Sequence, residues 1–152
     1  MSRISQSFLG LALLTSLFVG CGGGDFPTAP ATGVVLCDGK PVPGALVFFE
    51  PQLKGEDAMV GKTGLGVAND EGKFSVKTYG ANDGAVVGMH NVKVERGSGP
   101  GCDCAMNQDK VVLEVEVKSG EDNDFTINLP EKTRADTRAE QSQEDEDDEE
   151  DE

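Results

Sequence analysis

The chain has 152 residues, 37% of them apolar, with seven phenylalanines, one tyrosine and no tryptophan. Acidic residues outnumber lysine and arginine by 28 to 13, so the formal net charge is −15. This charge excludes a protein that binds nucleic acid through a basic surface, because such binding depends on releasing counterions from the phosphates. Twenty glycines and seven prolines predict many tight turns and argue against long helices.

Residues 1–20 are predicted to be an export leader. A short polar start with one cation, Arg3, precedes the apolar run 8–19. A helix needs about 20 apolar residues to span a bilayer, so this run is too short, but it has the length of the apolar part of a secretory signal peptide.

The end of the leader resembles the lipobox of bacterial lipoproteins. Residues 17–21 read Leu-Phe-Val-Gly-Cys, although Phe18 stands where leucine is usual. The resemblance implies that Cys21 is lipidated and becomes the mature N-terminus, since two or more acyl chains anchor a protein stably. The alternatives are an ordinary signal peptide or an uncleaved anchor.

Residues 21–32 are rich in glycine, proline, alanine and threonine and are predicted to form a flexible tether. The folded domain is expected over 33–130, where short β-prone runs alternate with turn signals such as Asp38-Gly39. The run 111–118 alternates most cleanly, which places Val111 and every second residue after it in the core. Seven strands with no amphipathic helix predict an all-β sandwich: residues 33–37, 45–50, 64–68, 73–78, 88–96, 111–118 and 124–129.

Three groups of residues carry a resemblance to a known family: 33–49 with its Asp-Gly-Lys-Pro-Val-Pro-Gly-Ala turn, 69–74, and 83–94. They resemble carboxypeptidase regulatory-like domains, and more closely the short lipoproteins with transthyretin-like sandwiches that are abundant in planctomycetes. The resemblance implies a seven-stranded Greek-key sandwich of the transthyretin (prealbumin) type. Its motifs are strand–turn–strand signatures, so they imply a fold and no catalytic residue.

Three cysteines remain after Cys21: Cys37 at the end of a predicted strand, and Cys102 and Cys104 in a predicted loop. Disulfides form in the oxidising environment that an exported chain meets. We predict a disulfide between Cys37 and one of the two loop cysteines, with Cys37–Cys102 as the candidate pair. A bond between Cys102 and Cys104 would close a very small, strained ring.

A soft-metal site is the alternative use of these cysteines. Cys102 and Cys104, with His90 and Met106, offer ligand types that suit Cu(I) or Zn. A structural zinc site usually takes four ligands at paired spacings, which the sequence lacks.

His90 is the only histidine, and strand alternation places it on the same face as Val92 and Val94, which indicates a structural role. The sequence contains no motif for nucleophilic, metal-carboxylate or phosphate-binding chemistry. Neither enzymatic activity nor a cofactor is expected.

Residues 131–152 contain 12 acidic and 3 basic side chains, and the last nine are all aspartate or glutamate. This segment is predicted to be a disordered acidic tail, because like charges repel and nothing apolar offsets the entropy of ordering. Its expected role is solubility; the alternative is weak binding of divalent cations or of a basic partner surface.

Together these features predict a lipid-anchored protein of the bacterial cell envelope that faces the periplasm or the exterior. We expect a non-enzymatic structural or interaction module whose partners are the membrane, through its anchor, and another envelope protein. The alternatives are the soft-metal lipoprotein and a sandwich that binds carbohydrate or matrix. Tyr79 is the only tyrosine for a sugar platform, which disfavours the last.

Overall fold

The computed structural model describes residues 26–53, 60–107 and 110–138. The predicted leader, Cys21 and residues 139–152 lie outside this part of the chain. Strands account for nearly all of its regular structure: β1 (Thr28–Ala29), β2 (Ala31–Cys37), β3 (Lys40–Pro41), β4 (Leu46–Pro51), β5 (Gly64–Val67), β6 (Lys73–Ser75), β7 (Ala85–Val86), β8 (Gly88–Glu95), β9 (Val111–Val117) and β10 (Asn123–Asn128). None of the helices in the described ranges is long and apolar enough to cross a membrane.

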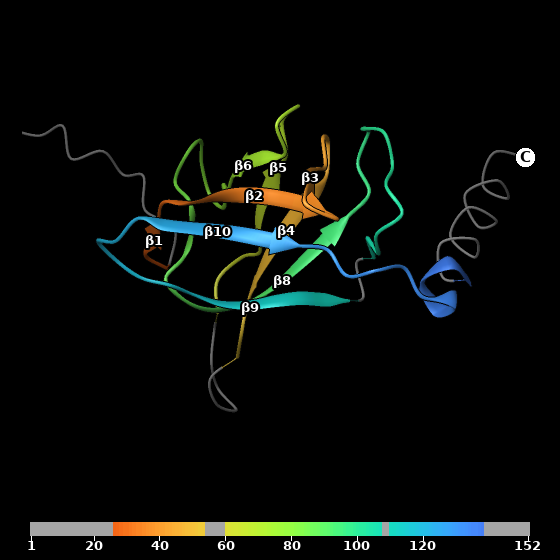
Figure 1. Ribbon diagram of the computed structural model, residues 1–152. Coiled ribbons are helices and arrows are strands. Elements are labelled where there is room, and N and C mark those ends of the chain that lie inside the picture. Colours follow the sequence, from red (N-terminus) through yellow and green to blue (C-terminus); the bar gives the residue numbers. More distant parts are fainter. Residues whose placement is uncertain (1–25, 54–59, 108–109, 139–152) are drawn as a thin grey trace, which may run out of the picture.

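Two four-stranded sheets form the two layers of the domain (Figure 1). In the first sheet β2 lies centrally, pairing in parallel with β10 and antiparallel with β3 and β6. The second sheet has the order β5-β4-β8-β9, with all neighbours antiparallel. An isolated bridge between Leu65 and Lys77 joins the layers along one side. The all-β, sandwich-like fold that was predicted is therefore confirmed.

The core lies between the two sheets. Phe49 of β4 is fully buried, and its ring lies 6.1 Å from the ring of Phe74 and 5.6 Å from the ring of Phe125, both in the opposite sheet. Aliphatic side chains from both layers surround this aromatic centre: Val35, Val47, Val76, Val92, Val94, Val117 and Ile127. The period-two alternation of these strands supplies the inward residues.

Each of the segments predicted as strands overlaps an observed strand, and these strands are β2, β4, β5, β6, β8, β9 and β10. The structure adds three strands of two residues each, β1, β3 and β7, which are too short for an alternation pattern to mark.

The predicted tether is shorter than expected, because residues 26–32 belong to the folded domain. β1 pairs with β7, and the backbone N–H of Val87 donates to the carbonyl of Pro27 at 2.9 Å. Ala29 and Ala31 are buried in the core. Small side chains are needed where the chain passes close to β7. The small residues that made this segment resemble a linker therefore allow close packing here.

One residue of the predicted strand 111–118 faces solvent instead of the core. Val111 was expected in the core but is 42% exposed. The pairing of β8 with β9 shifts register between Val92 and Lys93, whose partners are Leu113 and Val111. Val112 is therefore an extra residue in β9, and such a bulge changes the facing of the residues beyond it.

The first part of the predicted tail, residues 131–138, is ordered, so the expectation of disorder is wrong for these residues. Glu131 forms a β-bridge with Cys104, and a helical turn follows over residues 134–138 (Figure 1). Thr133 caps this turn: its backbone N–H donates to the Asp136 carboxylate at 2.8 Å, and its hydroxyl donates at 2.6 Å. Lys110 forms an ion pair with Asp136 at 3.2 Å, which ties the turn to the start of β9.

Because of these contacts, the stability of the protein at acidic pH depends on whether the carboxyl group of Asp136 is ionised. The hydrogen bonds from Thr133, with Lys110 nearby, lower the pKa of Asp136 to about 2 from its ordinary value of 3.8. A lowered pKa in the folded state stabilises the protein above pH 3.8, and this stabilisation is lost as the pH falls through about 2.

We therefore expect Asp136→Asn to be less stable than the wild type at pH 6, with the difference shrinking below about pH 4 and vanishing near pH 2. Urea unfolding at a series of pH values measures this difference. Thr133→Val should also lower the free energy of unfolding more at pH 6 than near pH 2, because the Thr133 hydroxyl is the largest cause of the lowered pKa of Asp136. A difference that persists undiminished at pH 2 would contradict the assignment.

Candidate functional site

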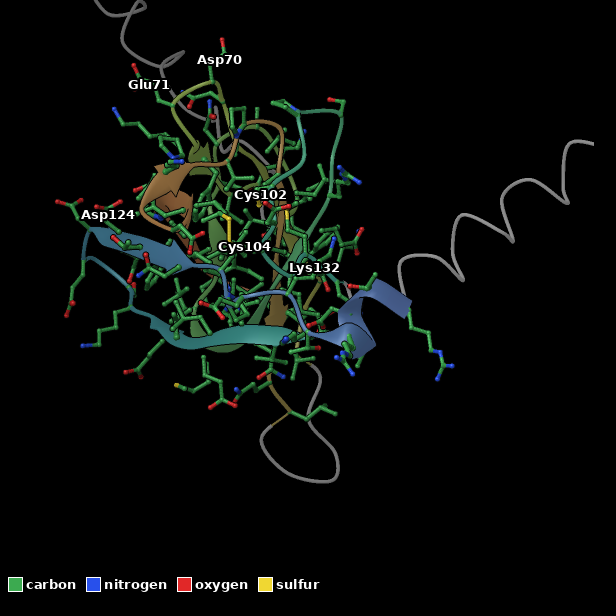
Figure 2. The ribbon with its side chains drawn as sticks, turned by 45° about the vertical axis from the view of Figure 1, so that its right-hand side comes forward. Asp70, Glu71, Cys102, Cys104, Asp124 and Lys132 are labelled. Carbon is green, nitrogen blue, oxygen red and sulfur yellow. A yellow bond between two sulfur atoms is a disulfide. The ribbon has the colours of Figure 1, made fainter. Side chains whose placement is uncertain are left out.

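Three cysteine side chains from two distant segments meet at one end of the sandwich. The Sγ atoms of Cys37, Cys102 and Cys104 all lie within 4.8 Å of one another. Cys37 and Cys104 are buried and form a disulfide across 67 residues of sequence, with their Cα atoms 5.8 Å apart. Cys102 is partly exposed and keeps its thiol. Figure 2 labels Cys102 and Cys104 close together, with the disulfide drawn as a yellow bond.

Local structure holds each side of this three-cysteine cluster. Cys37 is the last residue of β2, where Asp38 and Gly39 turn the chain with positive φ values of 50° and 74°. Cys104 pairs with Glu131 in an isolated bridge, and the N–H of Ala105 donates to the carbonyl of Pro130 at 2.9 Å. The loop that carries Cys102 and Cys104 is thus fastened to the chain just after β10.

Cys37 forms the predicted disulfide, but its partner is not the loop cysteine that we predicted. Cys37 is bonded to Cys104, so the candidate pair Cys37–Cys102 is wrong in its second member. Cys104 is the loop cysteine held by backbone pairing, whereas Cys102 lies two residues earlier and packs at the margin of the core.

His90 does not join the cysteines, so the predicted ligand set of Cys102, Cys104 and His90 is not assembled. Its ring is fully buried in β8, 5.7 Å from the ring of Phe49. The ring Nε2 lies 2.6 Å from the carbonyl oxygen of Val86, so Nε2 carries the proton and donates. Nδ1 has no hydrogen-bond partner among the described residues. His90 shares its buried face with Val92 and Val94, as the alternation predicted.

A second feature is an apolar patch on the outward face of the second sheet. Leu46 pairs with Val67, and Phe48 pairs with Leu65, in the register of β4 and β5. Residues paired in this way project from the same face, and it is the face opposite the buried Val47 and Phe49. We call Leu46, Phe48, Leu65 and Val67 the outer apolar patch; Val67 is 53% exposed.

Two glycines explain why β5 turns its large side chains outward. Gly64 and Gly66 occupy the inward positions of β5. A Cβ atom on Gly64 would lie 2.6 Å from Cγ1 of Val76, and one on Gly66 would lie 3.1 Å from the ring of Phe74. The Val76 side chain and the Phe74 ring thus fill this side of the core, which leaves no room for a Cβ atom at Gly64 and little room at Gly66.

Charged groups border the outer apolar patch along β8. Lys93 is the pairing partner of Phe48, and Glu95 is the pairing partner of Leu46. Lys93 also forms an ion pair with Glu50 at 2.9 Å. An apolar centre beside paired charges is the composition of many protein–protein interfaces.

Tyr79 is occupied within the domain. Its hydroxyl accepts a hydrogen bond from the backbone N–H of Lys62 at 3.4 Å, and Nζ of Lys62 lies 5.7 Å from the ring centroid. A sugar platform needs an open aromatic face, so the contact with Lys62 disfavours carbohydrate binding at this residue.

The outer apolar patch was not predicted, although the sequence carries one signal for it. Residues 45–49 read Ala-Leu-Val-Phe-Phe without alternation, so one of the two faces of β4 had to present apolar side chains away from the core. The predicted disulfide already placed Cys37 beside one of the loop cysteines, but that all three sulfurs lie within 4.8 Å of one another could be seen only in the fold.

No protein-family model matches this chain, and no curated protein or solved structure is significantly similar to it.

Proposed function

We propose that this chain is a lipid-anchored protein of the bacterial cell envelope whose sandwich acts without catalysis as a binding module. The proposed anchor rests on the leader and on Cys21, which follows it at the lipobox position. The proposed membership in the transthyretin-like, carboxypeptidase regulatory-like class, with its seven-stranded Greek key, rests on the turn motifs around Asp38-Gly39 and Asn69–Gly72. The two-layered all-β fold is compatible with that class.

The outer apolar patch is the observation that carries the binding function. Leu46, Phe48 and Leu65 are only partly buried, and none of them is among the partly buried side chains that pack against the core. Val67 is exposed and the other three are partly exposed, and the apolar surface that they leave in contact with water costs free energy. A partner protein that covers these side chains removes this free-energy cost.

The charge of the chain favours a basic protein as that partner. A second copy would carry the same net charge of −15, so like charges would oppose self-association. A basic envelope protein is attracted at long range and then contacts the outer apolar patch. The acidic residues beyond 138 would add to this attraction.

Site-specific photo-crosslinking in native membranes tests the proposal. We expect a photoreactive residue at Val67 to form one discrete adduct with a basic protein, in a yield that falls as salt rises, because salt screens the attraction. Leu53 is the matched control, since it is 70% exposed but lies at the far end of β4, beyond Pro51. Equal yields of the same adduct from Val67 and Leu53 would contradict specific binding at the outer apolar patch.

The same membrane sample tests the anchor. The intact mass of the uncrosslinked protein should correspond to a chain that begins at Cys21 and carries added acyl groups. An unmodified mass, whether or not the chain is cleaved elsewhere, would remove the lipid anchor from the proposal and leave the crosslinking result to decide the binding function.

A further inference from the structure

We propose that, in its reduced state, the three-cysteine cluster binds one soft monovalent metal ion of the Cu(I) type, and that the Cys37–Cys104 disulfide closes this site. The ligands are the Sγ atoms of Cys37, Cys102 and Cys104. This site differs from the one predicted from the sequence, because Cys37 replaces His90, and it does not depend on the proposed binding function.

The spacing of the sulfurs fits one shared ion. A three-coordinate ion with metal–sulfur bonds of about 2.3 Å holds its sulfurs about 4 Å apart. The three Sγ atoms already lie within 4.8 Å of one another, although two of them are bonded. Once that bond opens, rotation about the side-chain torsions of Cys37 and Cys104 can separate their sulfurs, because their Cα atoms are 5.8 Å apart.

The kind of ligand selects the ion. Cysteine thiolates favour soft ions such as Cu(I), while structural zinc sites almost always take four ligands. Across the described ranges, the cluster contains three sulfurs and no histidine or carboxylate oxygen. A trigonal set of three thiolates suits Cu(I), and the partly exposed Cys102 gives the ion a path from solvent.

Opening and loading the site are two balanced steps. An external dithiol gives two electrons and two protons to the Cys37–Cys104 disulfide and becomes a disulfide itself. The three cysteine thiols then lose three protons as one Cu(I) ion binds, which leaves a complex of net charge −2. Reoxidation by a disulfide-type oxidant re-forms Cys37–Cys104 and expels the ion.

Competition for Cu(I) against a chromophoric chelator tests the proposal. The full chain from the membrane fraction is kept in detergent, reduced, and freed of reductant under anaerobic conditions. We expect the reduced protein to take one equivalent of Cu(I) from the chelator and the oxidised protein to take none. Loading with zinc but not Cu(I), or no loading of the reduced protein, would overturn the proposal.

Two comparisons distinguish binding of Cu(I) by the folded three-cysteine cluster from binding by unarranged thiols. Cys102→Ser retains the disulfide partners and should fold normally when oxidised, yet it should bind Cu(I) at least tenfold more weakly when reduced. The reduced wild type unfolded in urea keeps every thiol without the spacing, and it should also bind at least tenfold more weakly. If either sample binds as tightly as the folded wild type, the three-cysteine site is wrong.

Discussion

Replacing Phe49 with alanine is expected to lower the free energy of unfolding by about 3–5 kcal/mol, the usual cost of removing a buried aromatic side chain. Phe49 is fully buried, and its ring lies within about 6 Å of the rings of Phe74, His90 and Phe125. Its removal would leave a cavity at the point where both sheets meet. Urea unfolding of the oxidised protein at neutral pH measures the loss.

Phe48 provides the matched control, because it has the same side chain and directly precedes Phe49 in β4, on the opposite face of the strand. It belongs to the outer apolar patch and is only partly buried, so Phe48→Ala should cost clearly less than Phe49→Ala. The two substitutions together test the facing of β4. Equal losses would contradict the facing of Phe48, and with it the outer apolar patch.

Replacing Cys37 with alanine is expected to destabilise the oxidised protein by about 4 kcal/mol, the chain-entropy value for a crosslink that spans a loop of this size. The disulfide joins residues that are 67 positions apart, so it restricts a large part of the unfolded chain. The midpoint of urea unfolding, recorded with and without a reductant, measures the effect. Reductant should lower the wild type to nearly the level of the variant.

The remaining cysteines sharpen this test. Cys102→Ala leaves the crosslink in place and should lose less than about 1 kcal/mol, as expected for a partly exposed side chain. In Cys104→Ala, the thiol of Cys102 lies close enough to Cys37 to form a replacement disulfide. Cys104→Ala should therefore be more stable than Cys37→Ala, and the reverse order would contradict the arrangement of the cluster.

Most of the strands could be predicted from the sequence, because alternation and turn dipeptides are local signals. β8 is an example, since His90, Val92 and Val94 all face the core as their spacing indicated. The failures arise where distant pairing decides the outcome. Val111 is turned outward by a bulge against β8, and Ala29 is ordered by pairing with Ala85. Neither effect has a signature in the residues nearby.

The candidate site could be predicted only in part for the same reason. An exported chain with Cys37 at a strand end predicts a disulfide, but choosing between Cys102 and Cys104 depends on which of them the backbone fixes. The bridge from Cys104 to Glu131 makes that choice, and it joins two segments that both looked irregular in sequence. His90 appeared available as a ligand because nothing in its strand indicates the contact with Val86.

The parallel pairing of β2 with β10 has a consequence for electrostatics at a membrane. Both strands run in one direction, so the chain enters the domain near Ala31 and leaves β10 beside Leu36 (Figure 1). These ends are about 17 Å apart along β2, at about 3.3 Å per residue. In physiological salt, charges are screened beyond about 8 Å. If the proposed anchor holds the domain at its entry end, the end of β10 lies beyond the repulsion of anionic lipid headgroups. The negative charge of a residue that follows β10 closely, such as the exposed Glu131, then remains available to attract a basic protein.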